Sequence, residues 1–453
     1  MLAAAHRNAF AFAIAVSIAG IACAAFAAPD IDDPALRTQV TKLDNGLTVL
    51  LLPETGTPGV SFQMWVRAGA KDETNYTGLA HLFEHMMFRG TDRLPPESHE
   101  RMIEGRGGRV NAFTTADTTV YFEDVAPDSL PLVIELEAER LANLKITEET
   151  LASERQVVLE ERRLRTEDQP DGRAFEALLG LAFQAHPYRV PTIGWRSDIE
   201  TVPVKACQDF FRTYYAPNNI VIAIAGDFDA ADTLARIRRA FGGFEPVAEI
   251  PRSPTKEPEQ RGERRAVVHF DVRSPILAAA WHAPATGHPD AEALDVASLV
   301  LSGGRSSRLY RKLVYDEQAA LGAQGAYWEL QDAGLFYAFA SVRPGRDIDE
   351  VERLFMAEIK RLQDERVSPA ELAKVKRQIE VDLLSGMETA NEKASRIARE
   401  YVSFGRIRSV DERLKAFAAV TAEDVQRVAR SYFRDDRRSV VHVVPPPRAE
   451  ASK

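Results

Sequence analysis

Two histidines and a glutamate in the segment His81-Leu82-Phe83-Glu84-His85 are the residues best suited to chemistry. Residues four apart on a helix lie on one face, so His81 and His85 can bind one metal ion with Glu84 beside them. This order inverts the His-Glu-x-x-His string of common zinc metalloproteases. A solvated helix face with an ordinary glutamate would give the same residues, so the choice depends on the rest of the chain.

The composition is that of a folded globular protein. The chain has 453 residues, of which 45% are hydrophobic and 27% are charged, enough for two or three domains with full cores. The net charge of −10 argues against nucleic acid or an anionic membrane surface as a partner.

The N-terminus, Met1 to Ala28, has the form of a cleaved secretory signal peptide. Arg7 precedes an apolar stretch that ends in small residues, and we therefore expect a periplasmic protein without a stable membrane anchor. A lipoprotein acylated at Cys23 is an alternative that Gly20 disfavours. After cleavage only Cys207 remains, which cannot form an internal disulfide and which we interpret as a small buried hydrophobe.

A Pro-rich and charged stretch, residues 249–265, separates two halves that repeat in outline. We predict a first domain over 35–248, this linker, and a second domain over 266–447. In each half two strand-like segments precede a helix that ends at glycine, and a later helix begins at a Ser/Thr cap. The pattern favours an α+β fold with two homologous halves, each an antiparallel-rich mixed sheet covered on one side by helices.

The second half has no counterpart of the metal set. Counting back from the glycines that end the two helices, His81, Glu84 and His85 correspond to Asp295, Ser298 and Leu299. The repeated fold therefore does not require the histidines, and this favours a functional role for them.

A catalytic zinc site needs a third protein ligand, with water in the fourth position. Glu154 and Glu161 lie on a charged helix of the same half, seven residues apart and so on one face. Alone, this helix could equally be acidic and solvated.

Together these residues resemble the inverted-zincin peptidases of the pitrilysin, insulin-degrading enzyme and mitochondrial processing peptidase superfamily. In that family a glutamate ligand follows the His-x-x-Glu-His helix at about the distance of Glu161 from His85. The resemblance implies one zinc ion per chain on His81, His85 and Glu161. It also implies catalytic roles for Glu84, as general base, and for Glu154, as a carboxylate that supports the ligands.

Other segments extend the resemblance over nearly the whole mature chain. Asn111, Ala112 and Phe113 match the family's edge strand, onto which a peptide substrate is added as a further β-strand. His186 matches a histidine that we interpret as structural. The segment from Gly303 to Leu309 matches a Gly-Gly-x-Ser-Ser-Arg-Leu string in the second half. We therefore expect a zinc metalloendopeptidase acting on peptides or unfolded polypeptides.

The chain departs from the family in the second half. Members that act alone carry an Arg and a Tyr, seven apart, that grip the substrate and stabilise the oxyanion; here Val314 and Leu321 hold those positions. A shifted register would use Arg308 and Tyr315 instead. We predict a dimer, preferably with a homologous subunit that supplies the Arg/Tyr pair; a homodimer with altered catalysis and a non-catalytic scaffold are the alternatives.

Overall fold

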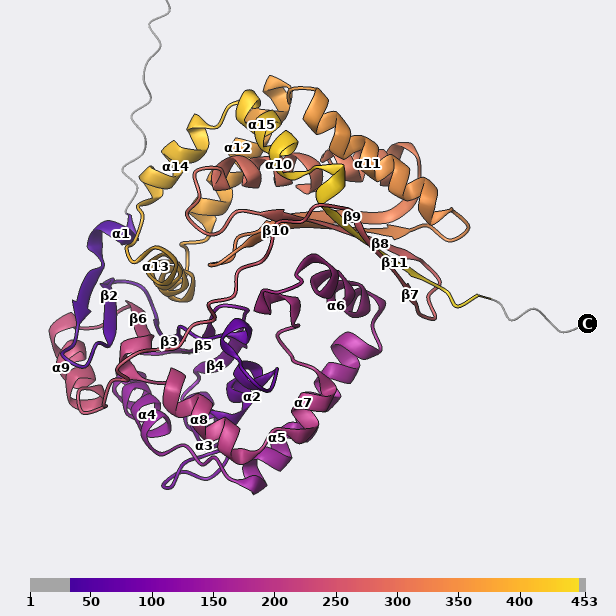
Figure 1. Cartoon of the computed structure of the whole chain (residues 1–453). Coiled ribbons are helices and arrows are strands. Elements are labelled where there is room, and N and C mark those ends of the chain that lie inside the picture. The colour runs from indigo at the N-terminus through magenta and orange to yellow at the C-terminus, as the bar shows by residue number, and fades with distance from the viewer. Residues whose placement is uncertain (1–32, 448–453) are drawn as a thin grey trace, which may run out of the picture. The chain divides into compact units, whose positions relative to one another are not determined.

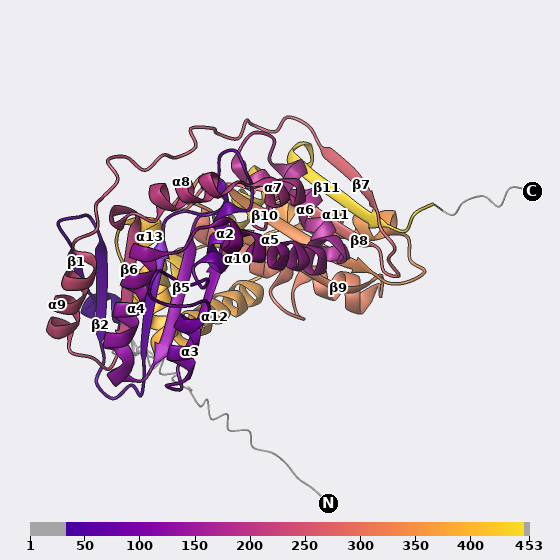
Figure 2. The same ribbon diagram turned by 90° about the horizontal axis from the view of Figure 1, so that it is seen from below.

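Residues 33–447 are described by the computed structural model, so the predicted signal peptide lies outside the described residues. Their strands form two sheets, each packed against helices (Figures 1 and 2). The first half holds β1 Gln39–Lys42, β2 Thr48–Pro53, β3 Val60–Val66, β4 Arg109–Thr114, β5 Thr119–Val125 and β6 Ile220–Gly226. The second half holds β7 Arg264–His269, β8 Ile276–Ala283, β9 Ala320–Trp328, β10 Gly334–Val342 and β11 Arg438–Val444.

Apart from the additional edge strand β1 of the first sheet, the two sheets have the same topology, which confirms the predicted pair of homologous halves. The first runs β1-β2-β6-β3-β5-β4 and the second β7-β11-β8-β10-β9. Each sheet has one parallel pair of neighbouring strands, β2 with β6 in the first and β7 with β11 in the second. All other neighbouring strands of both sheets are antiparallel. The sheets are therefore antiparallel-rich and mixed, as the sequence predicts. The strand β4 lies at one edge and β9 occupies the same place in the second sheet.

Six helices follow the strands in the same order in both halves, while α1, α3 and α9 occur in the first half alone among the described residues. The first half contains α1 Pro34–Arg37, α2 Leu79–Met86, α3 Ser98–Glu104, α4 Leu130–Asn143, α5 Glu148–Arg162, α6 Pro170–Ala182, α7 Arg196–Thr201, α8 Val204–Tyr214 and α9 Ala230–Phe241. The second contains α10 Ala291–Ser302, α11 Ile348–Asp364, α12 Pro369–Ser385, α13 Ala390–Phe404, α14 Val410–Ala419 and α15 Ala422–Tyr432. Matching capping boxes at Thr147 and Ser368 begin α5 and α12. Within residues 33–447 none of the helices combines the length and apolar character that crossing a membrane requires.

Each half contributes one helix to the other half's sheet. Helix α6 packs on β8 and β11 of the second sheet, and α13 packs on β3 and β6 of the first (Figure 1). The Gln63 side chain of β3 donates hydrogen bonds to the Asn391 carbonyl at 3.1 Å and to Ser395 Oγ at 2.9 Å. The prediction of helices on one side of each sheet was therefore incomplete. With both faces covered, β3 and β6 are buried along their whole length.

The segment between the halves is held by contacts to both halves, such as the hydrogen bonds from Arg252 to Asp72 and from Gln260 to the Arg438 carbonyl, each at 2.8 Å. The Glu257 carboxylate accepts hydrogen bonds from the backbone N–H groups of Gln184, Ala185 and His186 at 2.9 to 3.0 Å. These bonds tie residues 249–265 to the end of α6, the helix that the first half contributes to the second sheet.

Candidate metal centre

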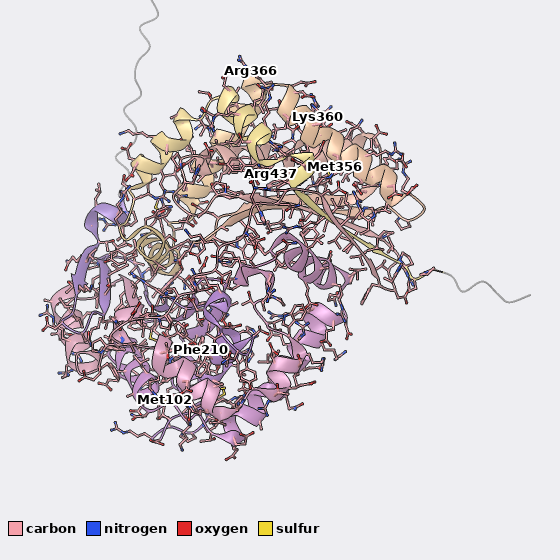
Figure 3. The ribbon with its side chains drawn as sticks, in the orientation of Figure 1. Met102, Phe210, Met356, Lys360, Arg366 and Arg437 are labelled. Atoms are coloured by element: carbon pink, nitrogen blue, oxygen red, sulfur yellow. The ribbon has the colours of Figure 1, made fainter. Side chains whose placement is uncertain are left out.

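The short helix α2 carries His81, Glu84 and His85 and is fixed at both its start and its apolar face. It begins after Gly78, whose φ is +87°, and the Glu73 carboxylate accepts hydrogen bonds from the N–H groups of Gly78 and Ala80 at 2.7 and 2.8 Å. These bonds satisfy donors that a helix start leaves free. Opposite the histidines, Phe83 stacks on Phe210 of α8 with ring centroids 5.6 Å apart. Figure 3 labels Phe210 among the elements of the first half.

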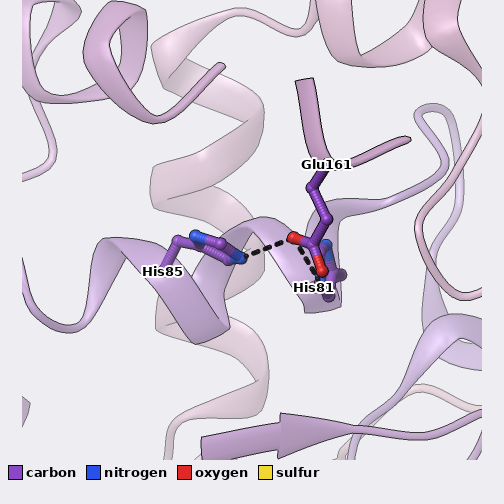
Figure 4. Close-up of side chains that lie close together, drawn as sticks. All are labelled: His81, His85 and Glu161. Atoms are coloured by element: carbon purple, nitrogen blue, oxygen red, sulfur yellow. Dashed lines mark ion pairs between the residues drawn. The ribbon is translucent and has the colours of Figure 1, made fainter. Parts of the chain in front are cut away.

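His81, His85 and Glu161 converge on one point (Figure 4). The carboxylate oxygen of Glu161, near the end of α5, lies 3.5 Å from His81 Nε2 and 3.2 Å from His85 Nε2. One ligand atom of each residue lies within 4.8 Å of the others. The structure thus brings the three predicted ligands together from two helices.

Glu154 contacts one member of this cluster, His85, but does not belong to the cluster itself. Its buried carboxylate lies 3.4 Å from His85 Nδ1 and forms an ion pair with Arg89. Because Nδ1 faces Glu154, the Nε2 atom of His85 is directed toward Glu161. A carboxylate in this place selects the ring orientation and tautomer of a ligating histidine.

The ionisation of the cluster follows its surroundings. Burial, followed by the charge of His85, lowers the pKa of His81 to about 4, which keeps this imidazole neutral. Burial also acts to lower the pKa of His85, but hydrogen bonds with Glu154 and Glu161 outweigh it and raise the pKa to about 9. The hydrogen bond with His85 lowers the pKa of Glu161 and keeps it anionic.

Glu84 lies in the same cleft but is not among the three converging residues. Its carboxylate accepts a hydrogen bond from Thr114 Oγ1 of β4 at 2.7 Å. Burial raises the pKa of Glu84, although the Thr114 bond opposes the shift. A carboxylate held beside a metal cluster, with a raised pKa, is suited to accept and return a proton.

The cleft that holds these groups has a volume of about 990 Å³ and is bordered by the edge strand β4. Of the predicted substrate-binding residues, Ala112 packs with the core on the α2 side of the sheet. Phe113 turns to the opposite face, where it meets Trp65 edge-on with ring centroids 6.0 Å apart. Asn111 is exposed, and its side-chain oxygen accepts a hydrogen bond from the Ala112 N–H at 2.8 Å.

Sequence reasoning placed Thr114 in the edge strand but gave neither Thr114 nor Arg89 a role at the site. Thr114 lies two residues after Ala112, and strand alternation places both side chains on one face. That alternation was a usable signal for Thr114, although it does not say which face meets α2. No local pattern pairs Arg89 with Glu154, because the two lie on different elements.

The remaining predicted residues lie elsewhere. His186 is buried with its Nε2 3.5 Å from Asp332 of the second half, outside the metal cluster. Cys207 is buried among apolar residues, and burial raises the pKa of its thiol to about 12. Both therefore have structural surroundings, in agreement with their interpretation from the sequence.

The alternative register of the Arg/Tyr pair does not fit the structure. Arg308 is buried and its Nε donates to Glu371 at 2.8 Å, while the side chain of Tyr315 is directed to solvent and is 74% exposed. Val314 packs against the second core, and Leu321, on β9, is 51% exposed. None of these four residues lines the cleft of the metal centre.

Two other groups of possible metal ligands occur among the described residues, and each already contains a guanidinium. They are His99 with Glu123 and Glu137, and Asp349 with Glu352 and His442. Arg140 pairs with Glu137 and lies 3.4 Å from Glu123. Arg265 binds both oxygens of Glu352 at 2.7 Å. We interpret both groups as internal ion-pair networks.

Comparison with known proteins follows the division into halves. The family model Insulinase (Peptidase family M16) matches residues 48–195, and the model Peptidase M16 inactive domain matches residues 201–379. The zinc protease PqqE of Helicobacter pylori is 31% identical over 408 residues, which cover 89% of this chain and 92% of the relative. This chain belongs to peptidase family M16.

Further M16 likenesses cover the same span. A protein of Arabidopsis thaliana named "Probable mitochondrial-processing peptidase subunit beta" is 29% identical over 88% of this chain and 77% of its own length. The crystal structure of a protease from Helicobacter pylori matches with a TM-score of 0.87 and 30% identity over 90% of this chain and 99% of that one. The names of the relatives support an M16-type metallopeptidase and imply zinc as its metal.

The residues of the cluster fit that metal. Two imidazoles and one carboxylate form a donor set typical of catalytic zinc in proteins. His81 Nδ1 is buried and finds no hydrogen-bond partner within residues 33–447, so the histidine is not held by a purely structural network. The absence of cysteine from the cluster also agrees with a catalytic and not a structural zinc site.

Proposed function

We propose that this chain is a zinc-dependent endopeptidase that hydrolyses peptides or unfolded polypeptides bound along β4. The observation that carries the proposal is the convergence of His81, His85 and Glu161, with the carboxylate of Glu84 in the same cleft beside an edge strand. A purely structural metal site would need neither a carboxylate that is not a metal ligand nor an unpaired strand edge next to it.

The residues divide the work as follows. Zinc, when bound to His81, His85 and Glu161, would polarise the scissile carbonyl and make a water molecule more acidic. Glu84 takes the proton of the attacking water and returns it to the leaving amine. Thr114 keeps the Glu84 carboxylate in place through the bond at 2.7 Å.

Substrate binding depends on the free edge of β4. This strand pairs with β5 alone among the described strands, so its outer backbone groups can pair with an extended peptide, largely independently of the peptide's sequence. In the structure without peptide, the Asn111 side chain accepts a hydrogen bond from the Ala112 N–H. A bound peptide would displace this side chain or bind beside it.

Replacing Glu84 with glutamine tests the proposed base. Glu84→Gln should bind zinc as tightly as the natural chain and lose hydrolysis of a fluorogenic peptide by about 10²- to 10⁴-fold, the usual contribution of a general base. The matched control is Glu149→Gln, an exposed residue near the start of α5. A Glu84→Gln protein with full activity would exclude the proposed mechanism.

We also propose that full activity needs a related partner chain that supplies the Arg/Tyr pair. Support comes from Val314 and Leu321 at the expected positions and from the ion pair that holds the buried Arg308 to the half-buried Glu371. It also comes from the Arabidopsis relative, whose name makes it one subunit of an enzyme. The form of residues 1–28 supports the periplasm as the place of action. The purified chain should cleave peptide slowly by itself; rapid turnover per zinc without a partner would contradict this proposal.

A further inference from the structure

The second half has a cavity at the place that corresponds to the metal centre of the first. Its volume is about 600 Å³, and it is lined by β9 and the helices α10, α12, α13 and α14. The correspondence follows from the topology shared by the two sheets and from the capping boxes that begin α5 and α12. The lining residues in place of the metal set are Asp295 for His81, Ser298 for Glu84, Leu299 for His85 and Asp382 for Glu161.

The contact between helix and edge strand is also repeated. Ser298 Oγ accepts a hydrogen bond from the N–H of Tyr327 on β9 at 3.0 Å, as Glu84 accepts one from Thr114 on β4. The second cavity is thus built by the same elements in the same arrangement, but with different polar groups.

One part of the lining is basic: Arg396, Arg399 and Arg413 gather there with Glu400 as a neighbouring acid. Arg396 Nη2 is buried and has no hydrogen-bond partner in the described part of the chain, and its Nη1 reaches only the Leu383 carbonyl at 3.5 Å. Arg399, at the exposed rim of the cavity, forms no ion pair with any residue from 33 to 447. Arg413 approaches Glu400 only to 3.6 Å. Burial, followed by the charge of Arg413, lowers the pKa of Arg396, which an anion in the cavity would reverse.

A second part of the lining is acidic and also unpaired. Asp295 takes part in no hydrogen bond or ion pair with the described residues. Burial, and then the charge of Glu329, raises the pKa of Asp295 to about 7. Leu299 and Ile379 add apolar surface to the same cavity. An acid without a partner, a buried guanidinium nitrogen without a partner and apolar side chains in one hollow are the complement of a ligand that carries both charges.

We propose that this cavity binds a small zwitterion, namely an amino acid or a short peptide with free termini. Its carboxylate would accept hydrogen bonds from Arg396 and Arg399, its ammonium group would donate to Asp295, and its side chain would lie against Leu299 and Ile379. Guanidinium groups suit carboxylates through paired, charge-assisted hydrogen bonds, and the volume is in the range of small-molecule sites. This site lies in the half without the metal set and does not depend on the proposed peptidase activity.

Calorimetric titration of the zinc-loaded full chain with L-leucine and two analogues tests the proposal without relying on a variant. Isocaproate lacks the amino group of leucine and isoamylamine lacks its carboxylate. Leucine should bind, and each analogue should bind at least about tenfold more weakly, because each leaves a charged group of the cavity unpaired. No measurable leucine binding, or equal affinities for leucine and isocaproate, would overturn the proposal.

Variants then locate the binding. Asp295→Asn and Arg396→Gln should each weaken leucine binding by at least about tenfold. The control Arg353→Gln, an exposed arginine of α11, should leave it unchanged. If His81→Ala abolishes leucine binding while Asp295→Asn does not affect it, leucine binds at the metal centre and the second site does not exist.

Discussion

Replacing Glu154 with glutamine should weaken zinc binding without removing a ligand. The Glu154 side chain is 2% exposed and its oxygen lies 3.4 Å from His85 Nδ1, while His85 Nε2 faces Glu161 at 3.2 Å. Glutamine keeps the size of the side chain but removes the charge that orients the imidazole and increases its basicity. Changes of this kind cost about 10- to 100-fold in metal affinity, which corresponds to about 1.4 to 2.7 kcal/mol.

The fold should tolerate this change. The side chain of Arg89, which loses its partner, is 24% exposed and lies 3.4 Å from Glu97, so it can pair there or reach water. Competition with a fluorescent zinc chelator measures the affinity, with Glu149→Gln on the same helix as the charge-matched control and circular dichroism to verify folding. Activity should recover at saturating zinc, since Glu154 acts through His85. A folded Glu154→Gln protein with the zinc affinity of the natural chain would refute the reasoning.

Three further predictions concern the framework. The hydrogen bond from Arg308 lowers the pKa of Glu371 from 4.5 to about 2. The ionised Glu371 therefore stabilises the folded state by about 1 to 2 kcal/mol after solvent screening. This contribution is fully present above the unfolded pKa and is lost as the pH falls from 4.5 to about 2. Urea unfolding of Glu371→Gln should therefore show a weaker loss of stability between these pH values, and an unchanged slope would contradict it. Ile397→Ala removes a fully buried side chain of α13 from its contact with the first sheet and should cost about 2 to 5 kcal/mol; calorimetry should show one transition at lower temperature, whereas two separate transitions would argue against coupled halves. Gly78→Ala places a Cβ 2.6 Å from the Ile193 carbonyl oxygen at a φ of +87° and should lower Tm, with a cost of at least about 1 to 2 kcal/mol; an unchanged Tm would show that the loop yields.

The parts of the site that could be predicted are those set by local geometry. The spacing of His81 and His85 is a property of one helix turn, and the caps of α5 and α12 are formed by residues three positions apart in the sequence. Glu161 was within reach because the family resemblance fixes its distance along the chain. Its own helix gave no such indication, since an acidic solvated face has the same composition.

The parts that escaped prediction depend on which surfaces meet. The apolar faces of α6 and α13 are visible in the sequence, but nothing local says that each faces the other half's sheet. The same holds for Phe113, whose side chain lies on the face opposite α2. Alternation assigns Ala112 and Thr114 to a common face without saying which face holds the metal centre.

The exchange of α6 and α13 makes the chain equivalent to a homodimer joined into a single polypeptide. A single copy would leave one face of its sheet bare, so each repeat is a folding partner that the other cannot lose. Binding chemistry and structural support reside on different helices: α10 carries Asp295, Ser298 and Leu299 at the positions of the metal set, while α13 covers the first sheet. In such a duplicated chain, the side chains of α10 can differ from those of α2 without affecting the support of the first sheet, because α13 provides that support.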